Sequence, residues 1–250
     1  MGSSKAEDGS WFFPDISIAA AALAPTGKLL AGINLSNPLL VTGRDEQGLP
    51  TGIAPDVAAL VAQLLGVALQ IRPYASPGET ADAVDECGIV LIAEEAQRAE
   101  RIAFSPPYVT IEATYMVREG WDGADITSID RDGVTIVAAA RSAYDLWLTR
   151  HITRAQIKRI QGLKEAEACF ENGGGDVLAG LRPALLALQP RLKGARLMEK
   201  PFSLVNQAIG TAHAHSHGAA FLKAFIAYAS VNGLIAEIVR RHQVVGLKIV

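Results

Sequence analysis

The sequence predicts an α/β fold arranged as two lobes. Strand-like and helix-like stretches alternate along the chain, which is the pattern of α/β proteins. They form two sets with the polar loop Glu119–Asp132 between them, and a late strand-like stretch, Leu204–Gly210, returns to the first set. We therefore expect two α/β lobes joined by two crossings, near Val109–Ala113 and near Ala195–Ser203.

Turn and cap residues bound the elements of the first set. Lys28–Asn34 has the composition of a short buried strand. Ile53–Leu65 repeats apolar residues at helical spacing, and Gly66 is placed to end that helix. Pro25 is placed to end an earlier helix, Ile16–Ala24. The other expected elements of this set are the strands Val67–Arg72, Gly88–Ala93 and Thr114–Val117 and the helix Thr80–Asp85.

The second set begins with a strand at Gly133–Ala138. The helix Ala143–His151 follows, and Ser142 has the side chain of a natural N-cap. The break Asn232-Gly233 separates two helices near the end of the chain. The other expected elements are the strands Gln156–Gln161 and Val177–Ala179 and the helices Leu163–Phe170, Pro183–Leu188, Gly218–Val231 and Leu234–His242.

Composition excludes several classes of protein. The 250 residues carry a formal net charge of -3 and no dense run of Lys or Arg, so we expect no nucleic-acid partner. No apolar run reaches the length of about eighteen residues that a transmembrane helix needs, so we expect no membrane insertion. Cys87 and Cys169 lie far apart without a CxxC motif, so we expect free thiols and no metal site. No cofactor is implied.

The first ten residues, M-G-S-S-K-A-E-D-G-S, do not have the charged and apolar regions of a signal peptide. We expect residues 1–24 to form a tail and a short helix. A cytoplasmic location is therefore one of the alternatives for this chain.

The most informative segment is E-A-Q-R-A-E-R-I-A-F-S-P-P-Y, at Glu95–Tyr108, which places Arg98 shortly before a Ser-Pro-Pro turn. A guanidinium there suits a carboxylate, because its planar fork donates two parallel hydrogen bonds. Other informative pieces are G-K-L-L-A-G-I-N, G-L-P-T-G-I-A-P-D-V-A-A-L-V-A-Q-L-L-G-V, V-T-I-V-A-A-A-R-S-A-Y-D-L-W-L-T-R, G-G-D-V-L-A-G-L-R-P and N-Q-A-I-G-T-A. In their order and spacing, the chain resembles the amino-acid-binding branch of the type 2 periplasmic solute-binding proteins from Pro25 to Gly246.

This resemblance implies the periplasmic binding protein type 2 fold, with mixed sheets, flanking helices and two hinge crossings. Lobe 1 would comprise residues 25–109 and 204–250, and lobe 2 residues 110–203. A small solute would bind between the lobes, which close over it by hinge motion. The resemblance further implies a periplasmic monomer that serves an ABC-type uptake system, with a membrane permease as its partner.

By the same resemblance, Arg98 holds the carboxylate of the ligand, an amino acid or related organic acid. Ser142 is expected to complete that site with its hydroxyl and the helix N-terminus, although an N-cap role without ligand contact is equally open. Arg141 stands where the family has glycine. It would cost energy at a positive φ, and its charge would favour a more anionic ligand.

A second departure concerns the ammonium group of an amino acid. The family places a carboxylate five residues after the position of Asp176, but Leu181 stands there in this chain. Glu112 could replace that carboxylate, and a solvated or hinge-bracing role is its alternative. Glu95 could orient Arg98. The weaker candidates for the rest of the site are Asn34, Ser36, Asn37, Tyr108, Tyr144, Asn206 and Gln207.

Few features indicate catalysis, and no catalytic residue is assigned. The chain has no G-x-S-x-G, P-loop, G-x-G-x-x-G or HExxH motif. The run H-A-H-S-H at His213–His217 is typical of adventitious metal binding. Two alternatives to transport remain: a cytoplasmic ligand sensor, and an enzyme resembling cyclohexadienyl dehydratase, with Glu95 or Glu112 as general acid.

Overall fold

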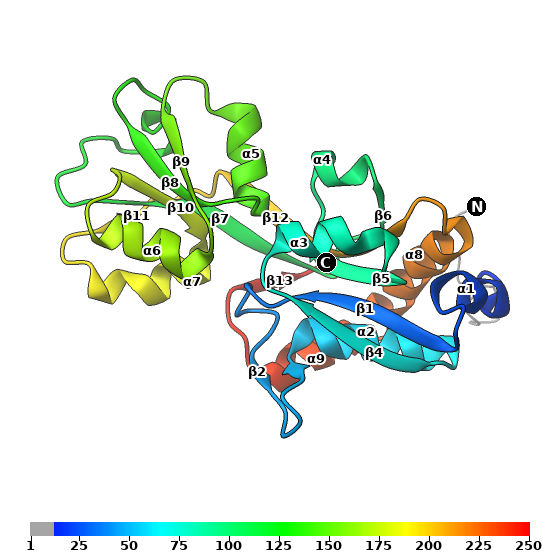
Figure 1. The fold of residues 1–250 in the computed structure, drawn as a ribbon. Coiled ribbons are helices and arrows are strands. Elements are labelled where there is room, and N and C mark those ends of the chain that lie inside the picture. The colour runs from blue at the N-terminus through cyan, green and yellow to red at the C-terminus, as the bar shows by residue number, and fades with distance from the viewer. Residues whose placement is uncertain (1–12) are drawn as a thin grey trace. The chain divides into compact units, whose positions relative to one another are not determined.

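The chain folds into two compact units, of which the computed structural model describes residues 13–250 (Figure 1). Unit 1 combines the chain up to Val109 with Asn206–Val250, and unit 2 is the continuous stretch Thr110–Val205. Two strands carry the chain between the units, β7 (Val109–Val117) and β12 (Ser203–Ala212). Of the tail expected at residues 1–24, residues 1–12 lie outside the described part of the chain.

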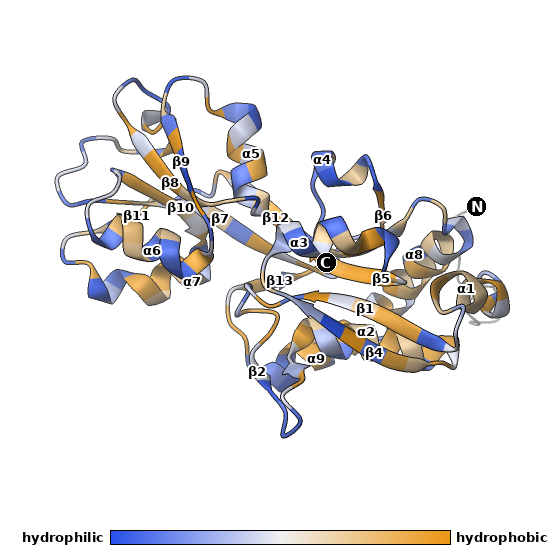
Figure 2. Cartoon of the chain, viewed as in Figure 1, coloured by the Kyte–Doolittle hydropathy of each residue, from blue (hydrophilic) through white to orange (hydrophobic). Residues whose placement is uncertain are grey.

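Unit 1 is built on a sheet with apolar central strands. Its strands, besides β12, are β1 (Lys28–Asn34), β4 (Ala68–Tyr74), β5 (Ile89–Ala93), β6 (Ile102–Phe104) and the short β2 (Gly43–Arg44), β3 (Pro50–Thr51) and β13 (Leu247–Ile249). The order of the main strands is β4-β1-β5-β12. β1 is parallel to both β4 and β5, and β12 is antiparallel to β5. Figure 2 shows β5 as apolar along its length, which is expected of a strand that is covered on both faces.

Helices of unit 1 cover both faces of this sheet. They are α1 (Ile16–Leu23), α2 (Ile53–Leu65), α3 (Pro77–Asp82), α4 (Ala96–Ala99), α8 (Ser216–Val231) and α9 (Leu234–His242), with a 3-10 turn at Ala83–Asp85. Ile89 and Leu91 of β5 pack into a larger core with residues of α1, α2, α8 and α9. Val90 and Ile92 pack into a smaller core with residues of the 3-10 turn. The side chains of β5 therefore alternate between two cores, as the two-residue period of a strand requires.

Two glycines set the ends of α2. Gly66 ends the helix in the left-handed conformation, with a φ of 67°. Gly52 precedes the helix with a φ of 144°, and a Cβ atom there would lie 2.4 Å from the carbonyl oxygen of Leu40. Only glycine fits this approach of two backbone segments.

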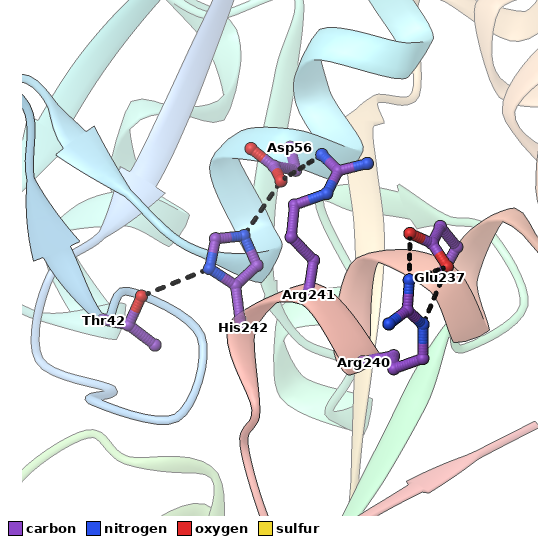
Figure 3. Close-up of polar contacts among 6 residues, drawn as sticks. All are labelled: Thr42, Asp56, Glu237, Arg240, Arg241 and His242. Atoms are coloured by element: carbon purple, nitrogen blue, oxygen red, sulfur yellow. Dashed lines mark hydrogen bonds and ion pairs between the residues drawn. The ribbon is translucent and has the colours of Figure 1, made fainter.

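Polar contacts join the last turn of α9 to the first turn of α2 (Figure 3). Nε2 of His242 and Nη1 of Arg241 lie 2.9 and 3.2 Å from Oδ2 of Asp56. Nδ1 of His242 lies 3.5 Å from the hydroxyl of Thr42. The carboxylate lies at a helix N-terminus and the basic groups at a helix C-terminus, so both helix dipoles favour the pairing.

Unit 2 is a second α/β layer with its own strand order, β7-β10-β8-β9. Its strands, besides β7, are β8 (Thr135–Ala139), β9 (Gln156–Ile160), β10 (Val177–Leu181) and the short β11 (Arg196–Leu197). Its helices are α5 (Ala143–His151), α6 (Leu163–Glu171) and α7 (Arg182–Leu188), with 3-10 turns at Ile126–Ser128 and Gln189–Arg191. β8 is parallel to β9 and β10, and β10 is antiparallel to β7.

Asp130 fixes the loop that leads into β9. Its carboxylate accepts hydrogen bonds from the N–H groups of Thr153, Arg154 and Ala155, at 3.0, 2.7 and 2.9 Å. The hydroxyl of Thr153 donates a fourth, at 2.9 Å. Burial alone would raise the pKa of Asp130, but these hydrogen bonds outweigh it and lower the pKa to about 2.

The predicted α/β fold class is confirmed, and several predicted boundaries shift. The helix expected at Thr80–Asp85 begins at Pro77, because the hydroxyl of Ser76 accepts a hydrogen bond from the N–H of Glu79 and caps it. The strand expected at Thr114–Val117 begins at Val109. The free state expected for both cysteines is confirmed. In residues 13–250 no single helix is long and apolar enough to cross a membrane. Taken together, α8 and α9 have the length and composition of a membrane span, but the pair is bent by 71°.

Candidate functional site

In unit 1 the predicted site residues gather at one edge of the sheet. β1 and β5 are parallel neighbours, so Asn34 and Ala93 end their strands at the same edge. β12 runs in the opposite direction and pairs Gln207 with Ala93. The segment that carries Glu95 and Arg98 follows β5 directly. The carboxyl ends of parallel strands are where ligands bind in open α/β sheets.

Arg98 is buried and anchored at this edge. It lies in α4 and is 7% exposed, and its Nη1 donates a hydrogen bond to the carbonyl oxygen of Ala93 at 2.7 Å. Glu95, which is also buried, is the N-cap residue of the same short helix. An anchored guanidinium keeps one orientation, which suits a group that must meet a planar carboxylate.

Asn34 and Asn37 shape the loop after β1. The Asn34 side-chain oxygen accepts hydrogen bonds from the N–H and the hydroxyl of Ser36, at 3.0 and 2.8 Å. The Asn37 side-chain oxygen accepts one from the N–H of Leu39, at 3.1 Å. These are Asx turns, in which the asparagine side chain stands in for a backbone group. A ligand contact by either residue stays a prediction.

Tyr108 lies in the larger core of unit 1 rather than at its surface. Its side chain has no exposed area, and its hydroxyl has no hydrogen-bond partner among the residues that the structure describes. Burial raises the pKa of Tyr108. These are properties of a packing residue, so we leave Tyr108 out of the site proposed below.

In unit 2 the predicted site residues also lie at the edge where the parallel strands end. β8 and β10 are parallel neighbours, and Arg141-Ser142 follows the first strand as Arg182 follows the second. β7 runs antiparallel to β10 and pairs Ala113 with Leu181. Glu112, one residue before Ala113, therefore lies at the same edge.

Arg141 and Ser142 form a strained and well-capped helix start. Arg141 has a φ of 58°, so the position where the resemblance expects glycine does adopt the left-handed conformation. The predicted N-cap role of Ser142 is confirmed, because its hydroxyl accepts a hydrogen bond from the N–H of Asp145 at 3.1 Å. The carboxylate of Asp145 in turn accepts one from the N–H of Arg141 at 2.8 Å. Burial raises the pKa of Tyr144, in the same first turn, to about 12.

Glu112 is paired within unit 2. Its carboxylate accepts a hydrogen bond from Nε of Arg182 at 2.5 Å, and the Arg182 side chain is 22% exposed. Nη2 of Arg182 donates to the carbonyl oxygen of Glu199 at 2.7 Å, which fixes the guanidinium. An ammonium group of a ligand would compete with Arg182 for Glu112. The ligand-binding role of Glu112 stays a prediction.

The histidine run makes local contacts. One ring nitrogen of His213 lies 3.0 Å from the carbonyl oxygen of Ala99, and one of His215 lies 3.0 Å from the hydroxyl of Thr211. Among residues 13–250, no three His, Cys, Asp or Glu side chains are grouped as metal ligands would be.

Comparison with known proteins assigns the family. The model of the bacterial extracellular solute-binding proteins, family 3, matches residues 29–243. The chain belongs to this family. Membership of this family indicates that the chain binds a solute, as periplasmic and extracellular solute-binding proteins do. No curated protein matches the chain in sequence.

Solved structures share the fold at low sequence identity. A mutant of ArgBP from T. maritima is 17% identical with a TM-score of 0.73, over 90% of this chain and 99% of that one. The substrate binding protein of an amino acid ABC transporter is 16% identical with a TM-score of 0.70, over 86% and 98%. An ancestral amino acid-binding protein, a precursor of cyclohexadienyl dehydratase, is 16% identical with a TM-score of 0.72, over 88% and 96%. At these identities the likeness shows the fold alone.

Sequence reasoning missed three residues that the structure adds to the unit 2 edge, Asp145, Arg159 and Arg182. The spacing S-x-x-D from Ser142 to Asp145 is that of a capping box, and this signal could have identified Asp145. Arg159 and Arg182 reach their partners through strand pairing, which no local pattern reveals.

Proposed function

We propose that this protein binds a small carboxylate-bearing solute, an amino acid or a related organic acid. Within unit 1 the candidate group for the carboxylate is Arg98, and within unit 2 the candidate groups are Arg141 and Ser142. The buried and anchored Arg98 carries the proposal, because its orientation is fixed at the carboxyl edge of the unit 1 strands. Family membership supports the same function.

The edge of unit 2 favours an anionic partner. Arg141 and Arg182 both lie there, and the two carboxylates described at that edge are already engaged, Glu112 by Arg182 and Asp145 by Arg159. The helix dipole of α5 adds partial positive charge at Ser142. The proposed solute therefore presents its carboxylate to this edge.

The role that fits such a protein is delivery of the solute to a membrane permease of an ABC-type uptake system. This role is supported by a structural neighbour that is the substrate binding protein of an amino acid ABC transporter. Deleting the gene should lower the uptake of the radiolabelled solute by intact cells, and re-expression should restore it. Unchanged uptake would contradict the transport role while leaving the binding function standing.

Binding is tested by titration calorimetry and thermal shift with L-arginine, L-lysine, L-glutamine, L-glutamate, glutarate and succinate. Three of these compounds are ones that similar structures contain: lysine, glutamine and arginine. A true ligand raises the unfolding temperature by mass action. The variant Arg98→Lys keeps a charge in the buried site but cannot donate the planar pair of hydrogen bonds, so we expect binding about tenfold weaker or more.

The matched control is Arg101→Lys, which changes an exposed arginine three positions away. Arg101 pairs with Asp85 at the surface, with more than half of each side chain exposed, so its replacement should leave binding unchanged. Wild-type protein that binds none of the six compounds would contradict the proposed function. Binding that Arg98→Lys leaves unchanged would remove Arg98 from the site.

A dehydratase-like enzyme is the second candidate. A structural neighbour is described as a precursor of cyclohexadienyl dehydratase, and Glu95 lies buried beside Arg98. Incubation of each bound compound, followed by mass spectrometry, separates the two functions. Product that disappears in Glu95→Gln would establish catalysis, whereas recovery of intact compound would leave binding alone.

A further inference from the structure

An ion pair between a buried carboxylate, Asp145, and a partly exposed guanidinium, Arg159, adjoins the proposed carboxylate-binding turn of unit 2. The side chain of Asp145 is 4% exposed, and its Oδ1 accepts a hydrogen bond from Nε of Arg159 at 2.8 Å. Its Oδ2 accepts one from the N–H of Arg141 at 2.8 Å. One carboxylate thus connects β9, α5 and Arg141, the residue before the N-cap.

Thr149 links Arg159 to Asp145 a second time. Nη2 of Arg159 donates to the hydroxyl of Thr149 at 2.8 Å, and that hydroxyl donates to the carbonyl oxygen of Asp145 at 2.8 Å. Arg159 lies in β9 opposite Ala138 of β8, the strand that leads into the turn. These bonds form a closed ring that fixes Asp145 relative to both strands.

The charges of Asp145 and Arg159 affect how an anion approaches the N-terminus of α5. Asp145 lies in the first turn of α5, the helix whose N-terminus is proposed to receive the carboxylate of the solute. The N–H groups of Ala143 and Tyr144 have no acceptor within the helix and point out of its N-terminus. A buried negative charge beside them would repel an anion strongly, because a low-dielectric interior screens it little. The guanidinium of Arg159 cancels that charge.

We propose that Asp145 and Arg159 are positioning residues for the carboxylate-binding turn. Asp145 holds the backbone of Arg141 in its left-handed conformation, and Arg159 neutralises Asp145 so that an anion can approach the N-terminus of α5. This inference rests on the proposed function, because it concerns the same site.

The test uses titrations with glutarate, L-glutamine and L-arginine, chosen because their net charges differ. Arg159→Met should weaken glutarate binding about tenfold and L-arginine binding least, because the uncompensated Asp145 repels a dianion more than a cation. Adding Asp145→Asn to that variant should restore glutarate binding to within about threefold, since asparagine keeps an oxygen acceptor without the charge. Arg154→Met, which breaks an exposed pair with Asp132 in the same unit, should change nothing.

If Arg159→Met does not fold, the double variant Arg159→Met with Asp145→Asn decides the question, because its single asparagine oxygen can still accept from the N–H of Arg141 and no guanidinium faces the NH2 group. Glutarate binding by the double variant should stay within about threefold of the wild type, and a larger loss would overturn the inference. In Arg159→Met, equal losses for all three compounds, or a loss that Asp145→Asn fails to restore, would show a purely structural role and would also overturn it. Unchanged binding in Arg159→Met refutes the inference alone, whereas a wild type that binds no carboxylate refutes the proposed function and the inference together.

Discussion

Replacing Asp130 by asparagine would remove the charge from a carboxylate that accepts hydrogen bonds from three consecutive backbone N–H groups, those of residues 153–155. Asparagine keeps one oxygen acceptor, but its NH2 group would then face backbone donors. We expect the variant to be less stable than the wild type at neutral pH.

The lowered pKa of Asp130 sets an upper limit on this effect. Burial acts to raise that pKa, and the hydrogen bonds from Ala155, Arg154 and Thr153 outweigh it, so the pKa falls from the ordinary 3.8 to about 2. The difference corresponds to at most roughly 2.4 kcal/mol of unfolding free energy. The carboxylate is partly exposed, so solvent screening reduces the expected loss to about 1 to 1.5 kcal/mol.

The sign of the pH dependence follows from the direction of the pKa shift. A carboxyl group whose pKa is lower in the folded state stabilises the fold above its unfolded-state pKa, and this contribution is lost as the pH falls through the folded-state value of about 2. The difference in stability between wild type and Asp130→Asn should be full at pH 7, roughly half as large near pH 3, and absent below about pH 2.

Urea unfolding at pH 7, 5 and 3 measures this difference, followed by tryptophan fluorescence, to which Trp121 and Trp147 of unit 2 contribute. The control is Asp132→Asn, whose carboxylate forms an exposed pair with Arg154 and should contribute little. A difference between wild type and Asp130→Asn that is equally large at pH 7 and pH 3 would refute the reasoning, because it would show lost packing rather than lost charge.

Two further predictions concern the candidate site. Tyr108→Phe removes a buried hydroxyl that has no partner in the described structure, so the free energy of unfolding should stay the same or rise by up to about 1 kcal/mol. Calorimetry should show an unchanged affinity for the solute, and weaker binding would return Tyr108 to the site. Arg141→Gly should relieve about 1 kcal/mol of left-handed backbone strain yet weaken the binding of anionic solutes, whereas Arg141→Gln keeps the strain and loses only the charge. If the glycine variant is no more stable than the glutamine variant in urea unfolding, the strain at Arg141 is negligible.

Local patterns in the sequence predicted the fold class and many of its elements. The apolar repeat of Ile53–Leu65, the cap at Ser142 and the stop at Gly66 each depend on neighbouring residues, and all three are present in the structure. One shifted boundary also has a local cause, because the cap at Ser76 moved the start of α3 to Pro77. The order of the motifs predicted the family.

The polar partners of the candidate site could not be predicted in the same way. Glu112 meets Arg182 because β7 and β10 pair in one particular register, and Arg159 meets Asp145 because β9 lies beside β8. Such pairs are far apart in the sequence, and one sequence gives no signal for the register of two strands. The burial of Tyr108 could not be predicted either, because a tyrosine after a Pro-Pro turn is as compatible with the hydrophobic core as with a binding site.

The way the chain divides between the units also sets the order in which they can fold during synthesis. Unit 2 is continuous, so it can fold once Val205 has left the ribosome, whereas unit 1 needs Asn206–Val250. Until then β5 has no strand on the side that β12 will occupy, although all five of its residues are buried in the finished fold. An apolar strand with an open edge is prone to pair with other chains. A nascent or truncated chain that ends before Asn206 would therefore combine a folded unit 2 with an aggregation-prone unit 1. Residues 206–250 thus protect the early strands of unit 1 from pairing with other chains.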